Sequence, residues 1–175
     1  WTNKEKDSKE SWGSKEYCIW NDKIIFGDSW AEWLKTANWW WENVNGYKGQ
    51  SSDFIASKFK HFVAEQWKQN LQWKELIILA WVNNSWNLNP TKSIGDMIDL
   101  AQANWMKVSV CNYCSDYKDA LEINWKLKKA YNENWKTKWV NFIDLHAKLP
   151  KTTNKLHPDS YENIIATLER ETRNV

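Results

Sequence analysis

The sequence predicts an all-α fold, an irregular bundle of five or six helices that includes one long helix. Only five Gly and three Pro interrupt the 175 residues, and they cluster where the helical spacing of apolar residues breaks. Five segments repeat apolar residues every three or four positions, the spacing of one buried helix face. The length fits a single domain over 17–175, after a charged leader, 1–16, that we expect to be poorly ordered.

The first elements expected along the chain are a short hairpin and a helix. Residues 19–26 are the only strand candidate and are compatible with a short N-terminal hairpin. Ser29 to Glu32 have the form of a capping box, and the apolar residues that follow keep helical spacing until Gly46. A helix over 29–45 is therefore expected.

Three helices are expected in the middle of the chain. Ser51 begins the first, whose apolar face extends to Leu71. The segment 72–85 contains a run of seven apolar residues that a buried strand would also explain, but the lack of strand partners favours a central buried helix. A capping box at 93–96 opens the third helix, which extends to Met106.

The C-terminal part is expected to hold the longest helix. Neither Gly nor Pro occurs in 116–149, and apolar residues there fall mostly three or four apart. A continuous helix over this segment would be about 50 Å long at 1.5 Å per residue. A last helix is expected to open at Asp159, after Pro158, and to bury Ile164, Ile165 and Leu168.

Charge and composition argue against two classes of function. The net charge is only +2, and all Lys and Arg residues except Arg170 and Arg173 are lysine, which argues against sequence-specific binding of nucleic acid. No apolar stretch reaches about 20 residues, the length that spans a bilayer. Three cysteines fit a reducing compartment or a single disulfide equally well, so the localisation stays open.

The sixteen tryptophans are more than a core of this size needs, which indicates a recognition surface. Trp39, Trp40 and Trp41 would point about 100° apart on one helix, so one buried face cannot hold all three. A second helix or another copy of the chain would cover the remainder. Together with Trp33, these residues are the expected contacts with a protein partner.

A second candidate surface combines lysine and tryptophan. Trp125, Trp135 and Trp139 lie near Lys128 and Lys129 in the expected long helix. Such a helix can bind anionic lipid or stack single-stranded bases, although burial of the rings beneath solvated lysines is the more frequent arrangement.

Cys111 and Cys114 have the spacing found in zinc knuckles and thiol redox centres. Zinc needs four ligands and no second pair exists, while redox catalysis favours a position after a strand, so two partly buried thiols are the simpler interpretation. No Ser-His-Asp order, phosphate-binding glycine loop or His-Glu-x-x-His occurs, and we expect neither metal nor cofactor.

The abundance of Trp, Lys and Asn in a glycine-poor chain is similar in composition to the tryptophan-rich antigens of malaria parasites. That resemblance implies a helical domain that binds host red cells or lipids. The intervals between tryptophans are erratic here, so no residue role is carried over, and a genome that reads an extra codon as Trp would produce the same excess.

The sequence therefore predicts a non-enzymatic interaction or assembly module that binds a protein partner or itself through exposed indoles. The first alternative is peripheral attachment to anionic membrane through the Lys/Trp-rich segment. The second is an enzyme, or a subunit of one, whose pocket carries no recognisable motif.

Overall fold

The computed structural model describes residues 22–37, 43–79, 90–152 and 155–172, and it has an α/β architecture. Five strands form one sheet in the order β2-β1-β3-β4-β5, and every neighbouring pair is parallel. The prediction of an all-α helical bundle is therefore wrong. The strands are β1 (Lys23–Gly27), β2 (Val44–Gly46), β3 (Glu75–Leu79), β4 (Lys107–Cys111) and β5 (Asn141–Ile143).

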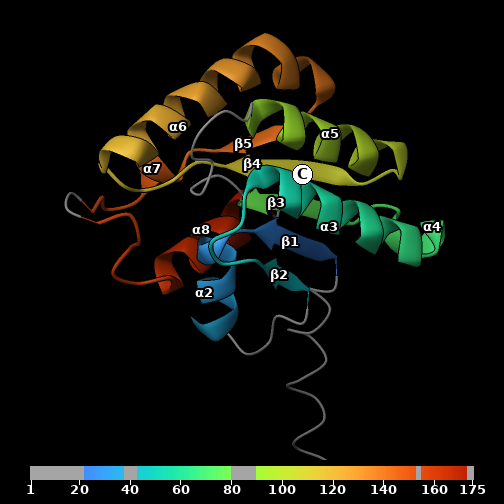
Figure 1. Ribbon diagram of the computed structural model, residues 1–175, viewed down its shortest axis with the longest axis horizontal. Coiled ribbons are helices and arrows are strands. Elements are labelled where there is room, and N and C mark those ends of the chain that lie inside the picture. The colour runs from blue at the N-terminus through green and yellow to red at the C-terminus, as the bar shows by residue number, and fades with distance from the viewer. Residues whose placement is uncertain (1–21, 38–42, 80–89, 153–154, 173–175) are drawn as a thin grey trace, which may run out of the picture.

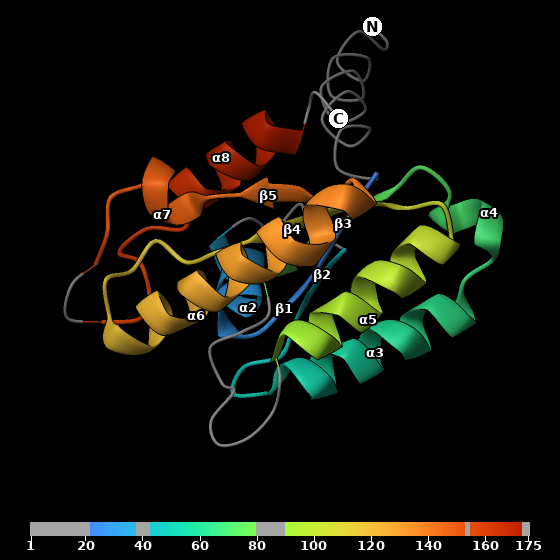
Figure 2. The ribbon, with the colours of Figure 1, turned by 90° about the horizontal axis from the view of Figure 1, so that it is seen from above.

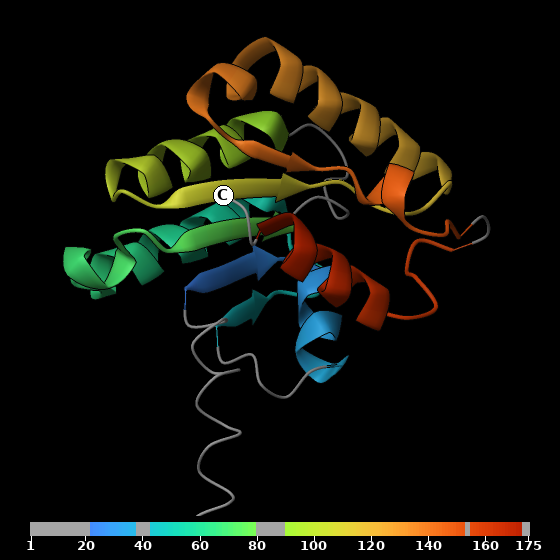
Figure 3. The same cartoon turned by 180° about the vertical axis from the view of Figure 1, so that it is seen from behind.

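Helices cover both faces of this sheet and give three layers. Figures 1 and 2 show α3, α5 and α6 on one face, and Figure 3 shows α2 and α8 on the other. The helices are α2 (Ser29–Ala37), α3 (Ser52–Glu65), α4 (Lys68–Leu71), α5 (Pro90–Ala103), α6 (Lys118–Ala130), α7 (Leu145–Lys148) and α8 (Glu162–Thr172); a π turn, η1 (Tyr131–Trp135), and a 3-10 turn, η2 (Lys136–Lys138), follow α6.

The segment expected to form a central buried helix contains β3, the middle strand of the sheet. All five residues of β3 are buried, as are all five of β1. A parallel sheet that is covered on both faces requires continuous apolar strands, so its sequence does not alternate. The missing partners of this run are two other short segments, Lys23–Gly27 and Lys107–Cys111.

The expected long helix over 116–149 is interrupted. Its first part is α6, but the chain then passes through η1 and η2 and turns at Trp139, whose backbone is left-handed with φ 61°. The chain leaves this turn as β5. Tyr131 and Phe142, which helical spacing would place on one helix face, instead lie on different elements with their rings stacked 5.2 Å apart.

Of the remaining sequence predictions, some are wrong, some are confirmed and some concern residues that the structure does not describe. The segment 23–27 is a single strand with parallel partners and not half of a hairpin, and the helix expected over 29–45 gives way to strand β2 at Val44. Ser93 lies inside α5 and not at its start. Ser51 does cap α3, and α8 does bury its three predicted residues. The leader 1–16 and the run 39–41 lie outside the described residues.

Two glycines allow α2 to lie against the sheet. A Cβ atom at Gly46 would lie 2.2 Å from the backbone nitrogen of Glu32. One at Gly27 would lie 2.7 Å from the Cβ of Ala31 on α2 and 2.3 Å from the carbonyl oxygen of Leu79. Neither backbone contact could relax by rotation of a side chain. The close approach positions the first turn of α2 directly after β1.

Tryptophan occupies three left-handed backbone positions, at Trp73, Trp105 and Trp139. After α5, Met106 N–H donates to the carbonyl of Ala101 and Trp105 N–H donates to that of Gln102. This pair of bonds is the Schellman ending of a helix, in which glycine usually takes the left-handed residue. Trp139 takes the corresponding place after η2.

Among the helices that the structure describes, none combines the length and the apolar character needed to cross a membrane.

Candidate active site at the carboxyl edge of the sheet

The strand order places a natural binding position at the carboxyl ends of β1 and β3. From β1 the chain moves to one side to form β2, and β3, β4 and β5 follow in order on the other side. Open parallel sheets bind ligands where the order reverses in this way, outside the carboxyl ends of the strands. The residues that directly follow β1 are Asp28 and Ser29.

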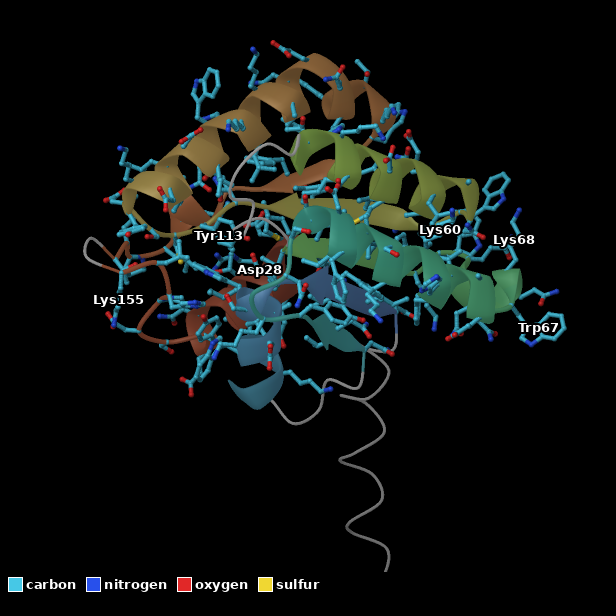
Figure 4. The ribbon with its side chains drawn as sticks, viewed as in Figure 1. Asp28, Lys60, Trp67, Lys68, Tyr113 and Lys155 are labelled. Atoms are coloured by element: carbon cyan, nitrogen blue, oxygen red, sulfur yellow. The ribbon has the colours of Figure 1, made fainter. Side chains whose placement is uncertain are left out.

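Asp28 is buried and caps α2. Its Oδ1 accepts a hydrogen bond from the backbone N–H of Trp30 at 3.0 Å, and its carbonyl accepts the first helical bond, from Glu32. Its Oδ2 accepts from the hydroxyl of Tyr113 at 2.9 Å. Figure 4 shows Asp28 and Tyr113 beside each other. These bonds place Ser29 at the first position of the helix. The sequence predicted Ser29 itself as the cap, and that prediction is wrong by one residue because Asp28 caps the helix.

Ser29 lies against a histidine from the opposite end of the chain. Its Oγ is 3.3 Å from Nε2 of His157, a residue that precedes α8. Ser29 is buried and His157 is half-buried. A serine hydroxyl in contact with an imidazole is the arrangement in which histidine can remove the serine proton and create a nucleophile.

Three contacts besides the one with Ser29 restrict the ring of His157. Its Nδ1 is 2.8 Å from the hydroxyl of Tyr161. The Trp30 ring stacks on it at a centroid distance of 6.2 Å, and the Trp33 ring meets it edge-on at 6.5 Å. The Trp30 ring is fully buried. The imidazole is therefore held in one orientation toward Ser29.

Burial lowers the pKa of His157, and the positive charge of Lys48 lowers it further, while the carboxylate of Asp28 opposes both. Lys48 belongs to the loop after β2, which is fixed beside α2 because the Lys48 N–H donates to Oε2 of Glu32 at 2.9 Å. With its pKa below 6.5, the imidazole is neutral near pH 7 and can accept a proton.

The phenol of Tyr161 stays protonated in this site. Burial raises its pKa, and the nearby Asp28 and Cys114 add to the rise. Tyr161 therefore faces His157 as a neutral group that can either donate or accept a hydrogen bond.

Cys111 and Cys114 are free, buried thiols at the end of β4 and in the loop that follows it. The sequence interpretation placed this pair away from any strand, and that placement is wrong, because Cys111 is the last residue of β4 and Cys114 follows it in the loop. Burial raises the pKa of both, to about 11 for Cys114, so neither thiolate is favoured near pH 7. Within the described ranges no three His, Cys, Asp or Glu side chains gather as metal ligands.

The predicted interaction residues that the structure describes lie on both faces of the sheet. Trp33 lies on α2 and is 46% exposed, whereas Trp125 lies on α6, across the sheet, and is 63% exposed. Lys128 and Lys129 are exposed on α6, and the Lys129 ammonium lies 5.4 Å from the Trp125 ring centroid. Trp139 is 92% exposed, but Trp135 is buried.

Sequence reasoning missed both Ser29 and His157 as chemical groups. Ser29 was interpreted as a helix cap because Glu32 follows it three residues later. The available signal was the triplet Gly27-Asp28-Ser29 after an apolar run, which places a serine at the carboxyl end of a strand. His157 carries no comparable local signal.

Comparison of the chain with models of protein families and with curated proteins finds no match.

Proposed function

We propose that this protein is a serine hydrolase that transfers the acyl group of a carboxylic ester to water. Ser29 is the nucleophile and His157 is the general base. The observation that carries the proposal is the 3.3 Å contact between Ser29 Oγ and His157 Nε2 at the carboxyl edge of the sheet.

In the first half of the reaction, Oγ attacks the ester carbonyl while its proton passes to Nε2. The tetrahedral intermediate collapses, the carbon–oxygen bond to the alcohol breaks, and the departing alkoxide takes the proton from Nε2. In the second half, Nε2 removes a proton from water, the hydroxide attacks the acyl group, and Ser29 leaves with the proton. The products are an alcohol and a carboxylic acid.

The position of Ser29 in the first turn of α2 supports the same chemistry. The N-terminus of a helix carries a partial positive charge of about half an elementary charge. Negative charge on the carbonyl oxygen develops next to this end when Oγ attacks. The close packing permitted by Gly27 and Gly46 keeps the helix end at that place.

A fluorophosphonate probe and p-nitrophenyl acetate test the proposal. The probe's phosphorus should bond to Ser29 Oγ with loss of fluoride, and the ester should release p-nitrophenol. Ser29→Ala should abolish labelling, and His157→Ala should slow it by on the order of a hundredfold or more. Exposed residues on α3 supply matched controls, Ser57→Ala and His61→Ala, which should behave as the wild type.

Undiminished labelling of Ser29→Ala, in a protein that melts at the wild-type temperature, would refute the assignment. Peptide mapping of the labelled wild type adds an independent check, because the adduct must lie on the peptide that contains Ser29.

Exposed indoles support a second candidate, the interaction module. Trp125 and Trp139 lie on the surface, and aromatic side chains of this kind dominate many protein interfaces. Sedimentation of the wild type and of Trp125→Ala tests self-association, and flotation with phosphatidylserine vesicles at low and high salt tests the membrane alternative.

A further inference from the structure

The nitrogen of His157 that faces away from Ser29 meets a phenol. In the serine hydrolases that use a Ser-His-Asp triad, a carboxylate accepts the Nδ1 proton and also stabilises the imidazolium. Here Nδ1 lies 2.8 Å from the hydroxyl of Tyr161, and within the described part of the chain the contacts of His157 are with Ser29, Tyr161 and two tryptophan rings and include no carboxylate.

The geometry determines which tautomer is competent for catalysis. Nε2 can accept the Ser29 proton only when the neutral imidazole carries its hydrogen on Nδ1. That N–H points at Tyr161, so the phenol oxygen must accept it. Removal of the hydroxyl would leave a half-buried N–H with no acceptor there and would favour the other tautomer, in which Nε2–H cannot accept.

A carboxylate is nevertheless placed beside this pair, because Asp28 directly precedes Ser29, whose Oγ contacts His157. Asp28 is fully buried, and two donors, the Trp30 N–H and the Tyr113 hydroxyl, hold its oxygens. Its negative charge favours the protonated form of His157, and the charge of Lys48 acts in the opposite direction. Lys155 and Asp159, in the same C-terminal segment as His157, pair with each other at the surface.

We propose that two residues of this site together replace the carboxylate of a Ser-His-Asp triad. Tyr161 accepts the hydrogen bond from Nδ1–H of His157, and the buried Asp28 carboxylate stabilises the imidazolium through space. Tyr161 and Asp28 are then positioning and electrostatic residues that act through His157. The inference rests on the proposed function for its catalytic part, while the state of the His157 ring can be measured without any substrate.

Two variants separate the two duties. Tyr161→Phe removes the acceptor and keeps the ring. Asp28→Asn removes the charge and keeps a residue that caps helices well, with Asp28→Ser as a second variant should the first fail to fold. Tyr131→Phe is the matched control for loss of a phenol, because Tyr131 packs on Phe142, away from His157.

The readouts are the ¹⁵N shifts of the His157 ring, which report its tautomer and its titration, and the rate of fluorophosphonate labelling. In Tyr161→Phe we expect the Nδ1–H tautomer to lose its dominance, with labelling slower by on the order of tenfold to a hundredfold and KM for p-nitrophenyl acetate unchanged. In Asp28→Asn we expect the tautomer to persist while His157 titrates at lower pH and labelling slows.

Failure of this inference and failure of the proposed function give different results. Wild-type tautomer and labelling in Tyr161→Phe, alongside lost labelling in Ser29→Ala, would overturn the role of Tyr161 and leave the hydrolase assignment intact. Unchanged titration of His157 in both Asp28 variants would overturn the role of Asp28. Full labelling of Ser29→Ala would remove the hydrolase assignment, and the ring measurements would still decide both contacts.

Discussion

The ammonium of Lys23 lies 3.0 Å from Oε2 of Glu75, and both side chains are buried. The two residues are paired in register on β1 and β3. Ser109 on β4 donates to the other carboxylate oxygen, and Lys23 also donates to the carbonyl of Thr172 at the end of α8. One buried ion pair thus links three strands to the C-terminal helix, at the opposite ends of the strands from Ser29.

Glu75→Leu should destabilise the protein by about 3–5 kcal/mol, because it leaves the Lys23 ammonium buried without its counter-ion. Lys23→Met should have a similar effect. The double variant should lose much less than the sum of the two, since neither charge then remains. Urea unfolding of all four proteins measures this cycle, and additive losses would show that the two charges do not depend on each other.

The labelling of Ser29 should remain fast below pH 6.5. Burial lowers the pKa of His157 from its ordinary value of 6.5, so the neutral, proton-accepting form persists into more acidic solution. The same shift affects folding, because the unfolded chain binds this proton more readily. The stability that His157 contributes is complete above pH 6.5 and is lost as the pH falls through the lower, folded-state pKa. A labelling midpoint above pH 6.5 would contradict the assigned environment.

Tyr113→Phe should destabilise the fold by about 1–3 kcal/mol, because the buried carboxylate of Asp28 loses one of its donors. Denaturant unfolding measures the loss. Tyr117→Phe is the control, since the Tyr117 ring is exposed and its change should lie within about 0.5 kcal/mol of zero. Equal stability of the two variants would mean that solvent reaches Asp28.

Trp139→Gly should stabilise the protein by about 1 kcal/mol. A left-handed backbone costs a residue with a side chain about 1–2 kcal/mol, and glycine avoids this at some entropic cost in the unfolded chain. Trp125→Gly, at an exposed position inside α6, is the matched control and should destabilise by about 1 kcal/mol. Thermal and denaturant unfolding should shift in opposite directions for the two variants.

Sequence patterns identified parts of several helices but assigned three of the strands, β2, β3 and β5, to helices. The apolar run in β3 has the length of a strand, and its all-round burial was recognised. The parallel partners were not, because β1 and β4 are only five residues long and lie far from β3 in the chain. Pairing between distant strands leaves no periodic pattern in the local sequence. Helix α3, by contrast, could be predicted from its cap at Ser51 and its single apolar face.

The candidate site escaped prediction for a related reason. Ser29 and His157 are 128 residues apart, and only the sheet topology and the return of the C-terminal segment bring them together. A serine at position 29 fits a helix cap as well as a nucleophile. The two roles are distinguished by the residue that contacts the Ser29 hydroxyl, His157, and this is a tertiary contact.

The three tryptophans with left-handed backbone conformation, Trp73, Trp105 and Trp139, raise a question about codon usage in the source cell. Within the described residues, every non-glycine residue at positive φ is a tryptophan, and all three are exposed. The backbone at these places has the conformation that glycine adopts without strain. If the source cell decodes the corresponding codons as glycine, the strain disappears together with three surface rings. Peptide sequencing of the protein from its own cell would then decide whether these three positions carry tryptophan or glycine.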